Sequence, residues 1–516
     1  MTRDTKGRGF IRWIVAGAAA LALVAGITAF FAVRNWPFTR RALTATLEDR
    51  FARKVVIQSF HETFFPPGCV AEGLSFLHRN RSDLPALIAV RKLIIKGSYA
   101  GLVRRRIDSV DVIGLHVTVP PSQLGAPSPV MPLTRGQSKN SIGIDRMTAS
   151  DAILEFIARE PGKEPFKLNI QKLLLDKVAE NEPVSFHTVL MNSKPPGTIT
   201  ASGQFGPWNA DDPGATPMSG SYTFDKANLA VFHGISGILS SKGKFNGAAR
   251  QAKAEGTVDV TNFHVDGSTH TTHLGARFRA DVDAENGDVA LESVESQVHR
   301  TTILSEGDIA TQSGQKGKTV GLDMRVSSGR IEDLLLFFTS QKQPSMTGAV
   351  QLHAKIRLPP GPGFLRKLRL TGDFGVSGGQ FTNSKAQAPL NDLSESSAGE
   401  SKQQEQEDPQ TVLSNLKGHV EALNGIATLT GVLFAIPGGT ARMRGTFNLL
   451  NRALDFQGVL ETDGKLADAT SGFKALVVKA ITPLMKKNRI TTVPFTIKGT
   501  SSHPEFGLDL AAKRMH

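Results

Sequence analysis

The strongest constraint on the fold is an alternation of apolar and polar residues with a period of two. In residues 198–205 the apolar and small residues hold the odd positions, and the same alternation runs through residues 276–283 and 441–449. Successive side chains of a β-strand point to opposite faces of the sheet. The period therefore predicts strands with one apolar and one polar face, which is typical of antiparallel sheets and argues against a βαβ protein.

Two hairpin turns are predicted between such runs. Glu285-Asn286-Gly287-Asp288 separates residues 276–283 from Val289 and Leu291, and Asn451-Arg452 separates residues 441–449 from the alternating residues 454–460. Asn-Gly between two alternating runs is a strong hairpin signal, because both residues tolerate positive φ. The runs and turns together predict a mainly β fold.

Only three segments have the spacing of an amphipathic helix. They are residues 44–52, with Leu43, Leu47 and Phe51, residues 331–338, and residues 473–484. The last has the most regular apolar stripe, whose spacing follows 3.6 residues per turn. We expect this helix to cover the open end of the β structure or to dock on a membrane or a partner. Its docking residues would be Phe473, Leu476, Val477, Ile481 and Leu484.

With so few helices, a long one-sided sheet has to cover its apolar face in another way. It can pack on a second sheet, close into a barrel, or curl into a trough around something apolar. The chain has 29 Phe against 3 Trp and 2 Tyr, and a Phe side chain has no polar atom that needs a partner. This composition suits a groove for acyl chains, and it suits a dry sandwich core equally well. The candidates for such a groove hold in-phase positions of the alternating runs: Phe205, Phe224, Phe278, Phe447 and Phe456.

Residues 14–33 form an uncharged apolar run that is long enough to cross a bilayer once as a helix. Arg3, Lys6, Arg8 and Arg12 precede it. The run is longer than the apolar region of a cleaved signal peptide. We therefore expect a signal-anchor with the N-terminus in the cytoplasm and the bulk of the chain on the other side of the membrane.

Breaks in the pattern predict the domain organisation. Residues 384–410 are rich in Ser, Gln and Glu without apolar periodicity, which is typical of a disordered linker or loop. A weaker break lies at residues 120–138. The predicted parts are a cytoplasmic tail and transmembrane helix at 1–35, an amphipathic helix and first β segment at 36–130, an elongated β-trough segment at 131–383, the linker at 384–410, and a C-terminal β module with an amphipathic helix at 411–516.

Motifs of catalysis and nucleotide binding lack the context that they need. Gly375-Val376-Ser377-Gly378-Gly379 resembles a hydrolase nucleophile elbow, but no helix pattern follows it. Gly317-Lys318-Thr319 ends like a phosphate-binding loop, but the earlier glycine is missing and a strand pattern follows. We therefore predict no enzyme and no catalytic residues.

Metal motifs fail in the same way. Asp281, Asp283 and Asp288 surround the Asn-Gly turn, but the glycine is one position late for a calcium loop. His264, His270 and His273 have no acidic or cysteine companion at zinc-ligand spacing, and the chain has one cysteine. No metal, cofactor or disulfide framework is predicted.

The net charge of +13 permits a nucleic acid, anionic lipid or another polyanion as a partner. Arg104-Arg105-Arg106 is the densest basic run. Tyr and Trp, which stack on bases, are scarce, and the predicted anchor argues against nucleic acid. Basic residues near anionic headgroups explain the charge more simply.

Recurring strand-and-turn phrases in this chain resemble the AsmA-like family of Gram-negative envelope proteins. The phrases are Pro196-Gly197-Thr198-Ile199, Gly203-Gln204-Phe205-Gly206-Pro207-Trp208, Gly329-Arg330-Ile331-Glu332-Asp333-Leu334, Met346-Thr347-Gly348, Pro359-Pro360-Gly361 and Val493-Pro494-Phe495-Thr496-Ile497-Lys498-Gly499-Thr500. The resemblance implies an inner-membrane-anchored periplasmic β-trough, similar to bridge-like lipid-transfer proteins. It also implies a part in phospholipid movement and outer-membrane assembly, with acyl chains, the inner membrane and envelope assembly proteins as partners.

The predicted function is therefore phospholipid handling in an apolar β-groove that contributes to outer-membrane biogenesis. The alternative is a non-enzymatic structural or assembly factor for envelope proteins, with a dry β-sandwich core that binds partners through its sheet edges. Lipids that co-purify with the chain would separate the two hypotheses.

Overall fold

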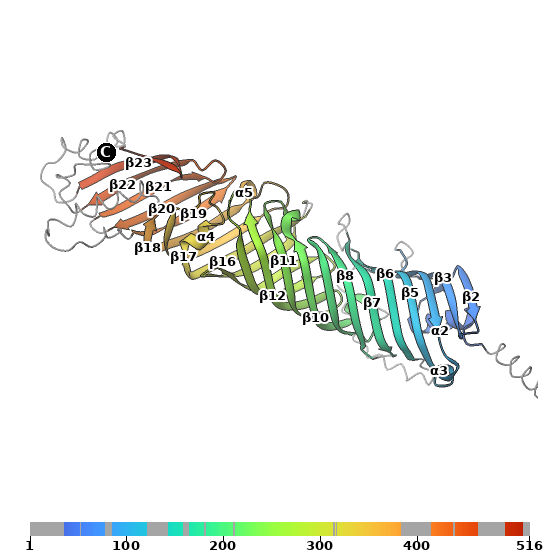
Figure 1. Cartoon of the computed structure of the whole chain (residues 1–516). Coiled ribbons are helices and arrows are strands. Elements are labelled where there is room, and N and C mark those ends of the chain that lie inside the picture. Colours follow the sequence, from blue (N-terminus) through green and yellow to red (C-terminus); the bar gives the residue numbers. More distant parts are fainter. Residues whose placement is uncertain are drawn as a thin grey trace, which may run out of the picture. The chain divides into compact units, whose positions relative to one another are not determined.

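The computed structural model describes residues 36–51, 53–77, 85–120, 143–157, 165–179, 182–209, 212–312, 315, 317–382, 414–436, 439–462 and 491–508. Internal contacts divide the chain into two units. Unit 1 contains residues 1–119, 126–155 and 171–185, and unit 2 contains residues 120–125, 156–170 and 186–516. Both units are mainly β with few helices, as the sequence predicts (Figure 1).

Unit 1 begins with a helix and a small antiparallel sheet. Its first elements are α2 (Arg40–Phe51), β1 (Val55–Val56), β2 (Ser59–Thr63), β3 (Gly68–Phe76), β4 (Ile88–Lys96), α3 (Tyr99–Val103) and β5 (Arg106–Val119). β3 pairs with β1, β2 and β4, and β4 pairs with β5, all antiparallel. Further along the chain lie β6 (Gly143–Phe156), nearly all of which belongs to unit 1, β7 (Phe166–Val178), which is divided between the units, and β8 (Val184–Ser193), most of which belongs to unit 2.

The predicted helix at 44–52 is present as α2, but it begins four residues earlier. The backbone N–H of Ala42 donates to Thr39 Oγ1 at 3.2 Å, so Thr39 caps the helix. At the other end, the Phe51 ring packs on Phe76 of β3 with a centroid distance of 4.8 Å. The cap and the ring contact together fix the length of the helix.

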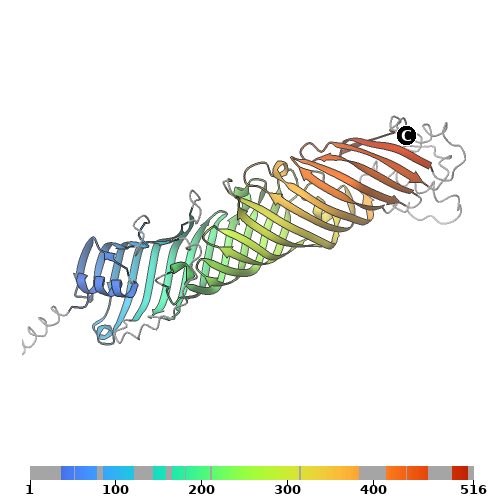
Figure 2. The same cartoon turned by 180° about the vertical axis from the view of Figure 1, so that it is seen from behind.

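Unit 2 is a large, open, curved antiparallel sheet. Its strands are β9 (Pro196–Phe205), β10 (Pro217–Asn228), β11 (Ile235–Ala248), β12 (Gln251–Val265), β13 (Thr272–Asp283), β14 (Asp288–Val298), β15 (Thr301–Thr311), β16 (Lys318–Arg330), β17 (Met346–Leu358), β18 (Arg369–Phe381), β19 (Ser414–Leu423), β20 (Ile426–Ile436), β21 (Gly439–Asn448), β22 (Leu454–Thr462), β23 (Thr491–Thr500) and β24 (His503–Leu508). From β9 onward every strand pairs with the next one in the sequence. The sheet is therefore a meander, and Figure 2 shows its strands following one another in chain order.

Short helices interrupt this meander only at its turns in the described residues. They are η1 (Pro213–Ala215), η2 (Leu229–Phe232), α4 (Ile331–Leu335) and α5 (Phe364–Lys367). The helix predicted at 331–338 is α4, which is shorter than its apolar stripe suggests. The residues after Leu335 form turns in which the N–H groups of Phe337 and Phe338 donate to carbonyls three residues back.

Both predicted hairpin turns are confirmed. Gly287 has φ +64° in the β13–β14 turn, and Arg452 has φ +64° in the β21–β22 turn. β18 and β19 pair directly, so the strands before and after residues 384–410 belong to one sheet. The predicted transmembrane run 14–33, the linker 384–410 and the helix 473–484 lie outside the described residues, and none of the helices that are described has the length and apolar character to span a membrane.

Candidate functional site

One side of the unit 2 sheet carries an unbroken transverse row of mostly apolar residues. Directly opposed residues of neighbouring strands point to the same face of a sheet, so the row can be followed through the pairing register from β9 to β23. We name the side that carries this row the apolar face. Its row is Ala201, Tyr222, Gly243, Gly256, Phe278, Val294, Ser305, Met324, Ala354, Gly372, Val420, Leu429, Gly445, Phe456 and Ile497.

The structure brings the five predicted groove phenylalanines onto this one face. Phe278 and Phe456 belong to the row itself. Phe205, Phe224 and Phe447 lie two or four residues from row members of their own strands, and side chains an even number of residues apart share a face. Their common face is thus a structural fact, whereas their contact with lipid stays a prediction.

Aromatic rings on the apolar face lie across glycines of the neighbouring strand. A Cβ atom at Gly445 would lie 2.6 Å from Phe456 Cδ1, and one at Gly458 would lie 2.7 Å from Phe495 Cζ. The missing side chain leaves room for the ring and for the close approach of the neighbouring backbone, because these Cβ atoms would lie closer still to the carbonyl oxygens of Asp455 and Arg442. The same arrangement joins Tyr222 to Gly243, Phe245 to Gly220, and Phe374 to Gly418. The sequence reasoning missed these pairs, although glycines at in-phase positions of the alternating runs are their signal.

The two faces of the sheet differ in exposure. Along β10 the residues of the apolar face, such as Phe224, are half-buried, whereas the alternate residues are exposed. β12 has the same pattern. Phe278 is half-buried, and Phe456 is buried with 8% of its surface exposed. Since a flat single layer would expose both faces alike, the difference indicates that the sheet curls toward its apolar face.

Turns at opposite ends of the unit 2 strands touch each other. In a meander the β10–β11 and β12–β13 turns lie in one row of turns, and the β17–β18 and β21–β22 turns lie in the row at the other ends of the strands. Phe364 of α5, in the β17–β18 turn, lies directly against Gly234. Arg452 Nη2 donates to the carbonyl of Gly267 at 2.8 Å, across 185 positions of sequence. We name these contacts between the two rows of turns the seam. Leu365, which lies beside Gly267, also belongs to it. The seam closes part of the curved sheet.

α4 packs on the apolar face near one edge of the sheet. A buried cluster there contains Val298, Ile303, Val326, Met346, Val350 and Val376, and Ile331, Leu334 and Leu335 of α4 pack against it. Three residues of the predicted apolar stripe at 331–338 therefore cover part of the sheet, whereas the fourth, Phe338, is exposed.

Two acidic residues hold α4 in place. The side chain of Glu332 accepts hydrogen bonds from the N–H of Gly348 at 3.1 Å and from Arg330 Nε at 2.8 Å. Asp333 accepts from the N–H of Arg300 at 3.0 Å and from Thr301 Oγ1 at 2.9 Å. Burial alone raises the pKa of Glu332, but the hydrogen bonds and the Arg330 charge outweigh it and hold the pKa below its usual value.

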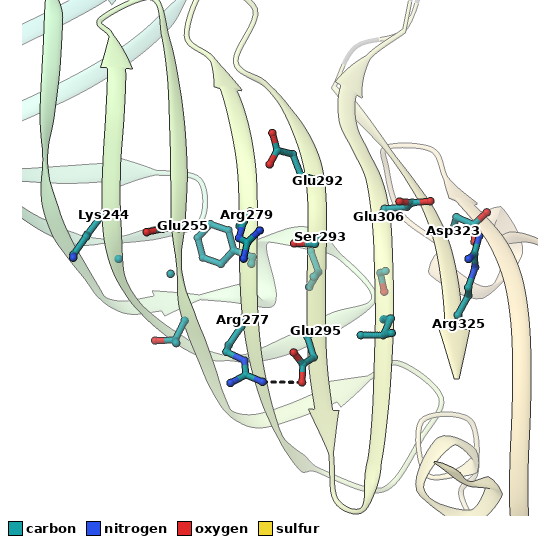
Figure 3. A pocket seen from close by; sticks show the side chains of 17 residues that line it. Lys244, Glu255, Arg277, Arg279, Glu292, Ser293, Glu295, Glu306, Asp323 and Arg325 are labelled. Carbon is teal, nitrogen blue, oxygen red and sulfur yellow. Dashed lines mark hydrogen bonds and ion pairs between the residues drawn. The ribbon is translucent and has the colours of Figure 1, made fainter. Parts of the chain in front are cut away.

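The opposite face is polar. An open hollow of about 860 Å³ lies over β11 to β16, where charged side chains of the polar face line it together with members of the row such as Phe278 and Val294 (Figure 3). Charges of both signs line it, and Arg277 pairs with Glu295 at 2.8 Å. Nearby, Lys253 Nζ lies 3.0 Å from Glu292 Oε1, which raises the pKa of the lysine and lowers that of the glutamate. Four basic and five acidic side chains line the hollow, so its net charge is small.

The remaining sequence motifs take structural roles. Gly375 to Gly379 lie within β18, and Lys318 begins β16. His264 Nδ1 contacts the carbonyl of His270 at 3.1 Å, and His270 Nε2 contacts that of Gln341 at 2.7 Å. Among the described residues no group of three or more His, Cys, Asp or Glu is arranged to hold a metal ion. The docking candidates Phe473, Leu476, Val477, Ile481 and Leu484 lie outside the described residues.

Comparisons with models of protein families, with curated proteins and with solved structures found no match. The chemistry of the apolar face is therefore the observation that bears most directly on function.

Proposed function

We propose that the chain is a non-enzymatic, inner-membrane-anchored protein of the periplasm that holds phospholipid acyl chains against its apolar face and thereby contributes to outer-membrane biogenesis. The observation that carries the proposal is the transverse row, which keeps one apolar surface continuous across β9 to β23. Half-buried residues such as Phe278 and Phe224 still have surface to cover.

The energetic reason is the hydrophobic effect. Each methylene group that leaves water for an apolar surface contributes about 0.8 kcal/mol. The phenylalanine rings that lie across glycines give an apolar surface on which a flexible chain can rest in many positions. Such a surface selects for apolar character rather than for a particular headgroup.

A second function is favoured by the cluster around α4. Its residues Val298, Val326 and Val350 have at most 2% of their surface exposed, so this part of the apolar face is already dry. If side chains of the protein itself cover the whole apolar face, the chain is a structural or assembly factor that contacts envelope proteins through the edge strands of its sheet.

The two functions are separated by the lipids that co-purify with the full chain, measured by mass spectrometry. The unsubstituted chain should carry phospholipid, and Phe278→Asp, which places a charge on the apolar face, should lower its amount. The matched control is Thr257→Asp, because Thr257 is exposed on the polar face next to the strand of Phe278. Absence of lipid in the unsubstituted chain, or equal lipid in a folded Phe278→Asp variant, would favour the assembly factor.

A further inference from the structure

Unit 1 presents large apolar side chains to solvent at one end of its sheet. Phe65, in the β2–β3 turn, and Val103, at the end of α3, each have 87% of their surface exposed, and Tyr99 has 49% exposed. Tyr99 and Val103 are four residues apart, so they lie on the same side of α3. Exposed side chains of this size are costly in water when they gather in one place.

These side chains are held by a defined scaffold. Tyr99 Oη donates to the carbonyl of Phe64 at 2.8 Å, and the rings of Phe65 and Tyr99 are 6.0 Å apart. The N–H of Gly97 donates to the carbonyl of Pro67 at 2.8 Å, which joins the β2–β3 turn to the segment before α3. The turn and the helix therefore form one local structure.

The first described residue of unit 1, Trp36, lies beside the β2–β3 turn. Trp36 is buried, and its ring lies 4.9 Å from that of Phe64. In the sequence Trp36 follows the apolar run 14–33 by three residues, which span at most about 10 Å. If that run crosses a bilayer, the aromatic turn is held within reach of the bilayer surface.

The flanking charges fit an anionic surface. Arg104 and Arg105 follow Val103 directly, and both are exposed. Aromatic side chains at the level of the headgroups, with basic residues beside them, are a typical arrangement of protein segments that lie in a membrane interface.

We propose that Phe65, Tyr99 and Val103 insert into the interface of the same bilayer that holds the run 14–33, with Arg104 against anionic headgroups. We name these four residues the interfacial tip. The proposal rests on the anchoring in the proposed function and does not depend on lipid handling at the apolar face. Its consequence is that unit 1 is held against the membrane at two points, the anchor and the tip.

The test uses the full chain with Phe65→Cys, labelled with an environment-sensitive fluorophore and reconstituted into vesicles of phosphatidylethanolamine and phosphatidylglycerol. The native Cys69 is buried with 1% of its surface exposed, and desolvation raises the pKa of its thiol to about 12, so it stays unlabelled. The label at position 65 should show a blue-shifted emission and be quenched by lipids that carry a nitroxide near the headgroup.

The matched control is the same label at Leu77→Cys. Leu77 has 40% of its surface exposed and follows the other end of β3, a strand of nine residues, which puts it about 30 Å away at ~3.3 Å per residue. Its label should keep the emission of a water-exposed site and escape quenching.

Two further measurements make the outcome decisive. Arg104→Gln should lower the ratio of docked to undocked label about fivefold, as expected for one charge near an anionic surface. Flotation of the vesicles shows whether the chain is membrane-bound at all. Failure to float overturns the anchoring, whereas a floating chain whose label at position 65 is water-exposed and unquenched overturns the interfacial tip alone. A protein partner for the tip would give this second result.

Discussion

At the scale of single residues, glycine and an aromatic ring act as a pair on the apolar face. A glycine inside a strand ordinarily weakens it, because it has no side chain to pack. Here Phe495 and Phe456 fill the space above Gly458 and Gly445. In each pair the ring covers a stretch of the neighbouring strand that carries no side chain, which agrees with the high content of both residue types.

Gly458→Ala tests this arrangement. The added Cβ atom would lie 2.6 Å from the carbonyl oxygen of Arg442 and 2.7 Å from Phe495 Cζ, so both the neighbouring backbone and the ring have to shift. Overpacking of this kind typically lowers the free energy of unfolding by about 1–3 kcal/mol. Urea denaturation measures the loss.

Gly375→Ala is the control for that measurement. Gly375 is also inside a strand of the sheet, but the nearest heavy atom to its added Cβ atom is 4.0 Å away. Its substitution should leave stability unchanged or raise it slightly, since alanine has fewer unfolded conformations than glycine. An equal loss at both positions would contradict the close packing around Gly458.

Cys69 gives a second prediction at this scale. Burial and the charge of Glu62 raise the pKa of its thiol to about 12, and the thiolate is the form that reacts. The full chain should therefore resist alkylation at pH 8 until it is unfolded. Mass spectrometry after treatment with iodoacetamide, with and without urea, checks this, and rapid modification of the folded chain would show that β3 opens.

At the scale of elements, α4 depends on its acidic residues more than on its length. A helix of five residues has little stability of its own. Glu332 and Asp333 tie it to the beginnings of β17 and β15, where they satisfy backbone N–H groups. The apolar residues of α4 can then stay on the cluster at Val350.

Glu332→Gln should lower the free energy of unfolding at pH 7 by about 1.5–3 kcal/mol, the range for hydrogen bonds to a charged group. The pKa of Glu332 is lowered from 4.5 in the folded chain, so its contribution is fully present above pH 4.5 and is lost as the pH falls through the folded value. The difference between the two proteins, measured by urea denaturation, should shrink toward low pH. A difference that does not depend on pH would contradict a role for the charge.

An element can be predicted from the sequence when the interactions that form it are local. The strands and the Asn-Gly turn were predictable, because the period of two and the turn residues act within a few positions. The common face of Phe278 and Phe456 was predictable in part, since each lies in phase within its own strand. The extent of α4 was not, because Phe337 turns away to contact Phe263 of β12.

The missed parts of the candidate sites depend on distant contacts. The seam joins Arg452 to Gly267, and no local pattern indicates such a pairing. The exposed turn at Phe64 and Phe65 carried a signal that the sequence reasoning passed over, namely two aromatic residues followed by Pro66 and Pro67.

At the scale of the whole molecule, the seam decides how open the apolar face of unit 2 is. Phe364→Ala removes the side chain that lies against Gly234. Phe364 is half-buried, so the loss in stability should be roughly half of the 3–5 kcal/mol for a fully buried phenylalanine. Hydrogen exchange of the β10–β11 and β12–β13 turns should rise as the seam loosens.

Phe232→Ala is the control for this variant. Phe232 lies two residues from Gly234 in the same connection, and 41% of its surface is exposed. Its removal should leave hydrogen exchange at the β12–β13 turn unchanged. Equal effects of the two substitutions would show that the connection loosens locally and that the two rows of turns do not stabilise each other.

The strict order of the meander has consequences for how the sheet folds and for how its length can change. Since every strand from β9 onward pairs with its neighbour in the sequence, each hairpin can form as soon as its own residues are available, which favours rapid folding. Contacts across the seam, 185 positions apart, can come only later. A hairpin inserted between two others could pair with the strands on either side. The sheet can therefore lengthen or shorten by whole hairpins while the other strands keep their pairing, as in repeat proteins.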